Sequence, residues 1–134
     1  MKFRALSLVT IAAAIFTVPA SAHHSFAMFD ATKEVTMQGT VKEFEWTNPH
    51  SWLRVTVNDP KVGKPVLWAL ELSSPARLTT MGMHADSVKV GDVVSVTFHP
   101  MKDGTRGGQF MSAVLPNGQK LGNGGQRNNP LGAE

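Results

Sequence analysis

Hydrophobic and polar residues alternate along most of the chain, with the period of two that is typical of half-buried β-strands. The longest alternating stretch runs from Val35 to Trp46, and its phase slips by one residue at Lys42-Glu43. A β-bulge produces such a slip, and Gly39 permits a sharp bend in the same stretch. We therefore predict a long, coiled first strand that ends at Thr47-Asn48-Pro49.

Four more alternating stretches predict strands at 51–57, 66–72, 93–99 and 109–115. Between the third and fourth, Ser74-Pro75 is typical of a helix start, with a serine N-cap and proline at the first helical position. Gly82 suits the helix end. This order predicts an all-β fold, a small five-stranded OB-like barrel with one short helix between strands 3 and 4. A barrel or sandwich with a different closure is the alternative.

The two ends of the chain differ from the strand-rich middle. Residues 1–22 combine Lys2 and Arg4 with an apolar run and the small-residue site Ala20-Ser21-Ala22, which is typical of a signal peptide. The run is too short to span a membrane. We expect cleavage after Ala22, export to the periplasm, and no membrane span afterwards. The Gly/Asn-rich stretch 116–134 is predicted to be disordered, so the OB-like domain occupies 23–115.

Composition excludes several classes of function. The chain has no cysteine, which excludes disulfides, thiolate zinc sites and iron–sulfur clusters. Loss of Lys2 and Arg4 with the signal peptide lowers the formal charge of +3 by two, so we expect no nucleic-acid partner. No serine lies in a nucleophile motif, and the carboxylates are scattered. We therefore predict that the protein is not an enzyme.

Histidines are the candidate metal ligands. Cleavage after Ala22 would place His23 at the N-terminus, where its α-amine and ring form one chelate, and nitrogen ligands favour Cu(II). His50 and His99 lie in loops that border one surface of an OB-like barrel. We therefore predict a periplasmic copper-binding module that uses His23, His24, His50 and His99. The alternative is a frayed terminus and two histidines that satisfy loop carbonyls.

Aromatic residues offer a second, metal-free function. Trp46 and Trp52 flank the turn between the first two strands, and Arg54 shares the outward phase of Trp52. An outward indole stacks on rings or cations. These three residues therefore predict a face that docks a small molecule or a periplasmic protein. A copper site that activates oxygen is the weakest alternative, and the oligomeric state is not predicted.

Several motifs resemble those of a known family. His23-His24-Ser25-Phe26, Trp46-Thr47-Asn48-Pro49-His50-Ser51 and Phe98-His99-Pro100 together resemble an uncharacterised family of small exported bacterial proteins, domain of unknown function family 6152. The resemblance implies export and a small β-barrel, and it implies no activity. A looser likeness joins the chain to small periplasmic OB-fold copper and silver chaperones, from which no ligand is carried over.

Overall fold

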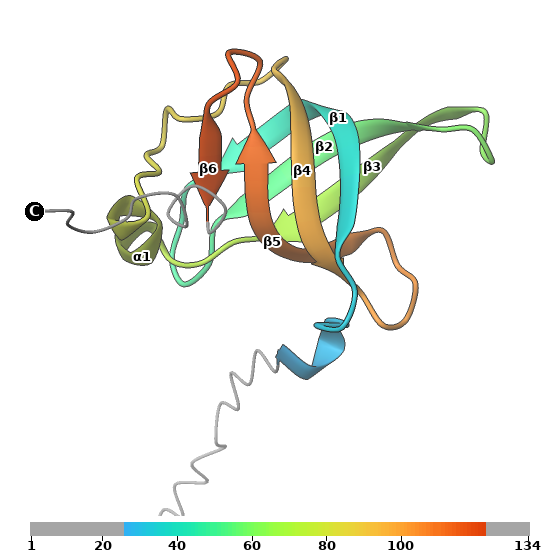
Figure 1. Ribbon diagram of the computed structural model, residues 1–134, viewed down its shortest axis with the longest axis horizontal. Helices are drawn as coiled ribbons and strands as arrows, with labels where there is room; N and C mark the ends of the chain where they lie inside the picture. Colours follow the sequence, from blue (N-terminus) through green and yellow to red (C-terminus); the bar gives the residue numbers. More distant parts are fainter. Residues whose placement is uncertain (1–25, 123–134) are drawn as a thin grey trace, which may run out of the picture.

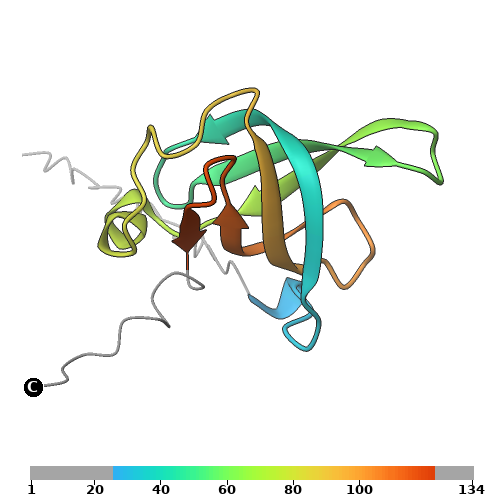
Figure 2. The ribbon, with the colours of Figure 1, turned by 45° about the horizontal axis from the view of Figure 1, so that its top comes forward.

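The computed structural model describes residues 26–122, which form six strands, one α-helix and one short 3-10 helix (Figure 1). The strands and helices follow the order η1 (Phe26–Met28), β1 (Val35–Glu45), β2 (Trp52–Asp59), β3 (Lys64–Glu71), α1 (Pro75–Thr80), β4 (Val93–Pro100), β5 (Gly107–Val114) and β6 (Lys120–Gly122). The β2–β3 hairpin extends away from the body of the molecule (Figure 2).

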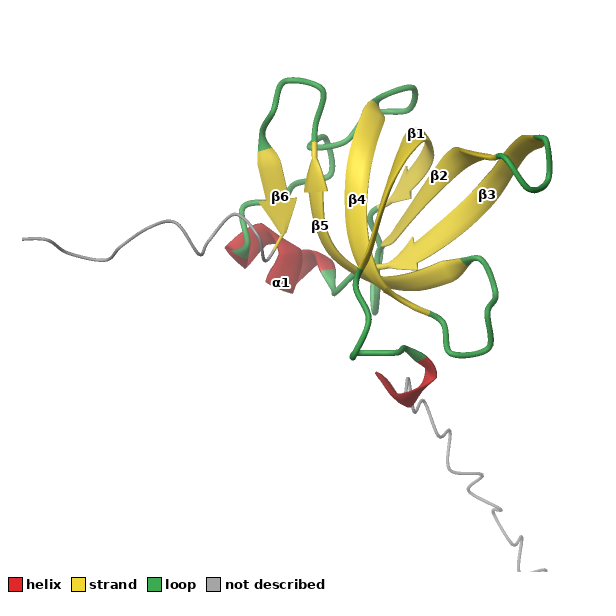
Figure 3. Ribbon diagram, turned by 45° about the vertical axis from the view of Figure 1, so that its right-hand side comes forward, coloured by secondary structure: helices red, strands yellow, loops and turns green. Residues whose placement is uncertain are grey.

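The sheet closes on itself to form a barrel. Its strands lie in the order β3-β2-β1-β4-β5-β6, and a parallel pairing of Ala69–Glu71 with Gly107–Gln109 joins β3 to β5. Five strands are thereby closed, with α1 at one end of the barrel (Figure 3). The predicted OB-like barrel with one short helix between strands 3 and 4 is confirmed.

A bulge allows β1 to pair with two neighbouring strands. Its register against β2 shifts between Val41 and Glu43, where the sequence predicts the slip. Residues 35–40 of β1 pair with β4, and residues 40–45 pair with β2. The bulge therefore bends β1 across the barrel, as an extra residue in one strand does.

Local signals also place the helix. The Ser74 side chain accepts a hydrogen bond from the Arg77 amide, and Pro75 opens α1. At its end, Gly82 has a φ of 80°, and the Met83 amide donates to the Leu78 carbonyl at 3.0 Å. This is a Schellman ending, for which glycine suits the left-handed position. It directs buried Leu78 and Met83 into the core.

The C-terminal prediction is partly wrong. Within 116–134, expected to be disordered, β6 pairs with β5 and the Leu121 side chain is buried. One leucine among polar residues gives almost no periodic signal, yet it has a partner because β5 offers an open edge. The predicted signal peptide at 1–22 and residues 123–134 lie outside the described residues. Within 26–122, no helix is long and apolar enough to cross a membrane.

Candidate functional site

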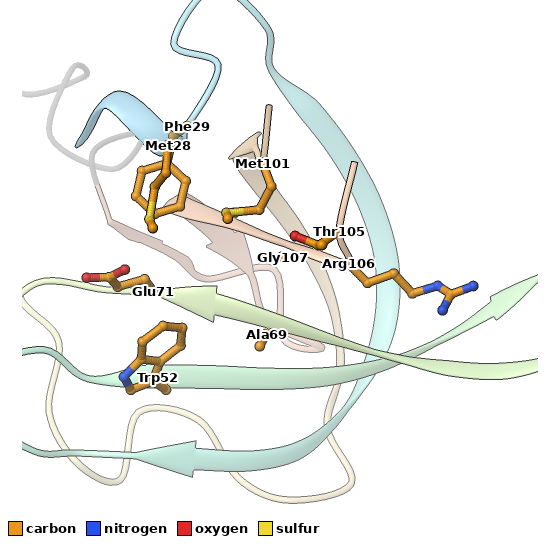
Figure 4. A pocket seen from close by; sticks show the side chains of 10 residues that line it. Met28, Phe29, Trp52, Ala69, Glu71, Met101, Thr105, Arg106 and Gly107 are labelled. Atoms are coloured by element: carbon orange, nitrogen blue, oxygen red, sulfur yellow. The ribbon is translucent and has the colours of Figure 1, made fainter. Parts of the chain in front are cut away.

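A cleft of about 300 Å³ lies on the outer face of the barrel (Figure 4). One wall comes from β2 and β3, a second from the loop between β4 and β5, and a third from the segment before β1. The lining is mostly apolar and consists of Met28, Phe29, Trp52, Ala69, Glu71, Met101, Thr105, Arg106, Gly107 and Gly108.

Strand alternation positions the floor of the cleft. Leu53 and Leu70 point into the core, so their neighbours Trp52 and Glu71, which are paired across β2 and β3, face outward. Gly107 and Gly108 at the start of β5 adjoin this floor. A Cβ at Gly107 would lie 3.0 Å from the Ala69 carbonyl oxygen of β3, and a Cβ at Gly108 would collide with the His99 carbonyl oxygen and the Phe98 ring of β4. Small residues on β5 therefore let the β3–β5 pairing close beneath the cleft.

A β-bridge and backbone hydrogen bonds hold the segment before β1 over this face. Phe29 forms an isolated β-bridge with Met101, and its side chain is buried. The Asp30 amide donates to the Pro100 carbonyl at 2.8 Å, and the Lys102 amide donates to the Met28 carbonyl at 3.0 Å. These backbone hydrogen bonds hold Phe29 and Met28 across the cleft from Trp52.

Two acidic turns stabilise the loops beside the cleft. The Thr32 hydroxyl donates to Asp30 at 2.6 Å and Lys33 pairs with it at 3.0 Å, and together they lower the pKa of Asp30 to about 2. In the β4–β5 loop, the amide and hydroxyl of Thr105 lower the pKa of Asp103. Both carboxylates are therefore ionised at neutral pH and brace their turns.

The charged groups of the cleft lie at opposite ends. Glu71 is only 7% exposed, and its Oε1 contacts Nδ1 of His50. A second cavity of about 60 Å³ adjoins this pair, and Phe29 and Gln109 also line it. Arg106 lies at the other end, where its guanidinium points away from the cavity (Figure 4). Neither charged group therefore points into the space between Trp52, Met28 and Met101 (Figure 4).

The two loop histidines are not brought into one ligand set. The Nδ1 of His99 donates to the Lys33 carbonyl at 2.7 Å, and β5 lies between His99 and the Glu71 of β3, with Gln109 paired to both. Across the described range, no group of three His, Cys, Asp or Glu residues is arranged to hold a metal ion. His23 and His24 lie outside the described residues.

The predicted aromatic face divides in two. Trp46 packs edge-on against Phe44, with ring centroids 5.8 Å apart, and against the core. Trp52 lies elsewhere, in the cleft, and the Arg54 guanidinium carbon is 5.9 Å from its ring centroid. Trp52 and Arg54 therefore belong together, whereas Trp46 is a packing residue.

Sequence reasoning missed most of the cleft lining. Phe29, Met28 and Met101 meet only because a β-bridge joins segments 72 residues apart in number, and no local pattern signals that. Glu71 is different. Glu71 lies between Leu70 and Leu72, which are on the inner face of the strand, so the sequence predicts that its side chain faces outward. The sequence did not predict that this side chain is buried.

Comparison with known proteins identifies a family and one similar solved structure. The family of unknown function DUF6152 matches residues 11–110, and the chain belongs to it. No curated protein matches the chain. Among solved structures, the S. cerevisiae mitochondrial single-stranded DNA binding protein Rim1 is similar at 12% identity and a TM-score of 0.48, over 63% of this chain and 93% of that chain.

Proposed function

We propose that this member of the DUF6152 family is a periplasmic, non-catalytic binding module that holds a small organic ligand in the cleft over Trp52. OB-like barrels bind ligands on the face of their second and third strands and with the loop between their fourth and fifth strands. Trp52, Glu71 and Met101 come from these three parts of the barrel. The position of the cleft therefore suits a ligand site.

The lining of the cleft is the observation that carries this proposal. Two aromatic rings and two thioethers, from Phe29, Trp52, Met28 and Met101, border one space of about 300 Å³. Ligand sites are clefts of this size or larger with apolar walls and few polar groups. Each Å² of apolar surface that a ligand covers contributes roughly 25 cal/mol. The cleft thus offers binding free energy that a polar surface lacks.

A ligand screen with a matched pair of variants tests this function. Small aromatic, aliphatic, amine and carboxylate compounds are titrated while protein-observed NMR follows the indole signals. We expect Trp52→Leu to weaken binding of any hit about tenfold, because stacking on the ring is lost. Thr56→Ala, on the same strand outside the cleft, should leave it unchanged. Hits that bind both variants equally would contradict the proposal.

Copper binding by histidine remains a second candidate, and the orientation of the rings favours it. A metal-bound histidine commonly donates its other ring N–H to a carboxylate or a carbonyl. In His50 the partner of Nδ1 is a carboxylate, and in His99 it is a carbonyl. A ring that donates from Nδ1 keeps its lone pair on Nε2, which is the nitrogen that would then coordinate copper.

Native mass spectrometry tests the copper candidate. The protein is purified from the periplasm, and its N-terminus is read from the denatured mass. A chain that begins at His23 and gains one copper ion would agree with the candidate, and His50→Ala should weaken that binding. Copper affinity that is unchanged in His50→Ala, or that stays flat between pH 7.5 and about pH 5, would contradict it, because imidazole must be deprotonated to coordinate.

A further inference from the structure

We infer that the ligand of the cleft is an uncharged aromatic compound, whose ring stacks on Trp52 beside the thioethers of Met28 and Met101. This inference rests on the proposed function of the cleft and specifies the chemistry of its ligand. Three features carry it: the direction of the charged side chains, the combination of an indole with two thioethers, and the volume of the cleft.

The charged side chains of the lining point away from the space that a ligand would fill. Among the described residues around the cleft, Glu71 and Arg106 carry charge. The Glu71 carboxylate contacts the His50 ring and is directed away from the space above Trp52, and the Arg106 guanidinium is directed outward (Figure 4). A charged group in that space would lose hydration without gaining an ion pair. An uncharged ligand avoids this cost.

An indole and two thioethers border the same space. Met28 and Met101 direct their sulfur atoms into the space above Trp52 (Figure 4). Aromatic rings stack on one another with an offset, and thioether sulfur atoms make favourable contacts with aromatic rings. A planar aromatic ring above Trp52 gains both kinds of contact, whereas a saturated ring gains only the burial of apolar surface. The lining therefore favours an aromatic ligand over an aliphatic one of the same size.

The volume of the cleft and the hydroxyl of Thr105 indicate the size and the substituent of the ligand. A volume of about 300 Å³ is at the lower end of the range for small-molecule sites, so we expect one ring with a short substituent. Thr105 also lines the cleft, and its hydroxyl donates to Asp103 at 2.7 Å. Its oxygen therefore retains lone pairs that can accept a hydrogen bond from a ligand hydroxyl. Benzyl alcohol combines these features.

Four probes of similar size test this inference. Benzyl alcohol is the uncharged aromatic compound, cyclohexylmethanol is its saturated counterpart, and benzylamine and benzoate are a cation and an anion at neutral pH. Each is titrated into the mature protein, and protein-observed NMR gives the dissociation constants. We expect benzyl alcohol to bind about tenfold more tightly than either charged probe. We also expect it to bind about threefold more tightly than cyclohexylmethanol, although cyclohexylmethanol is the more hydrophobic of the two.

Matched variants assign the aromatic preference to named groups. Met28→Leu and Met101→Leu, combined in one protein, keep apolar walls and remove both sulfur atoms, so the preference for benzyl alcohol over cyclohexylmethanol should fall about twofold. Met81→Leu makes the same change at the end of α1, outside the cleft, and should preserve the preference. Trp52→Leu removes the stacking surface and should abolish it. If the double variant does not fold, Trp52→Leu supplies the test.

The outcomes separate the two proposals. Binding of cyclohexylmethanol, benzylamine or benzoate that is as tight as that of benzyl alcohol would overturn this inference and leave the cleft as a binding site. A preference for benzyl alcohol that persists in both the double variant and Trp52→Leu would also overturn it, because the aromatic ring would then bind elsewhere. Failure of all four probes to bind at millimolar concentration would overturn both the inference and the proposed function.

Discussion

Two of the hollows on the described part of the barrel are nearly equal in size, and they differ in chemistry. The cleft over Trp52 encloses about 300 Å³, and a groove on the other side of Arg54 encloses about 340 Å³. The groove is lined by four polar side chains together with one glycine and one valine, namely Gln38, Gly39, Thr40, Thr56, Asn58 and Val93. Volume alone therefore does not identify a binding site.

The two hollows differ in the free energy that is gained when a ligand covers them and displaces water. Amide and hydroxyl groups such as Gln38 and Thr56 are well solvated in the groove, so covering them gains little. The cleft instead exposes ring and thioether surface, whose removal from water is favourable, and it contains a buried carboxylate. Four predictions use the groove as the reference against which the cleft is measured.

The largest difference in the free energy of unfolding is expected between two glycine substitutions, one in a strand beside each hollow. Gly108→Ala should lower the free energy of unfolding by about 3 kcal/mol, because its Cβ meets rigid groups of β4. Gly39→Ala should cost about 1 kcal/mol, since its Cβ would lie 3.1 Å from the nearest atoms of β2. Urea denaturation measures both values. Equal losses would show that β5 does not pack tightly against β4 at Gly108.

Removing the cover of the cleft should have the next largest effect. Phe29→Ala is expected to lower the free energy of unfolding by about 2 kcal/mol, because a ring that is 6% exposed is lost from between the two cavities. Val93→Ala in the groove, where the side chain is 49% exposed, should change it by less than about 0.5 kcal/mol. Denaturation of both variants in parallel gives the comparison, and a Phe29 variant as stable as the Val93 variant would contradict the fastened cover.

The residue between the hollows should contribute modestly. Arg54→Met keeps the apolar stem and removes two ion pairs that are open to solvent, so the expected loss is about 0.5 kcal/mol. A double-mutant cycle with Glu43→Gln measures the coupling. High salt should reduce this coupling energy. A coupling energy that does not change with salt would indicate that the ion pair is more buried than it is in the structure.

Acid should affect the cleft side of the barrel and spare the groove. The pKa of Asp30 falls from 3.8 to about 2 on folding, so its stabilising contribution is present above pH 4 and is lost as the pH falls through about 2. The groove has no titratable lining residue. NMR titration of the Asp30 carboxyl and the Thr32 amide should give a midpoint near pH 2. A midpoint near the ordinary value would contradict the turn.

The sequence was most informative where structure depends on neighbours in the chain. The bulge between Val41 and Glu43, the Ser74 cap and the left-handed Gly82 were all predicted, because alternation, capping and turn chemistry are local. The outward direction of Trp52 followed from the same alternation. The order of these elements then sufficed to predict the barrel.

Features that depend on distant segments were not predictable in this way. The bridge between Phe29 and Met101 and the contact of Glu71 with His50 each join residues far apart in the chain. No alternation or cap encodes such pairings. The cleft is built from them, so the sequence indicated the correct face through Trp52 but not its depth or its apolar lining.

The most direct test of the cleft as the binding site is an NMR titration with a compound that binds in the ligand screen, followed at the methionine methyl groups and the backbone amides. We predict that the Met28 and Met101 methyls and the Trp52 indole shift together, while Met81 near the helix and Thr56 in the groove stay unchanged. Shifts centred on Thr56 and Gln38, or none at the two cleft methionines, would contradict the account.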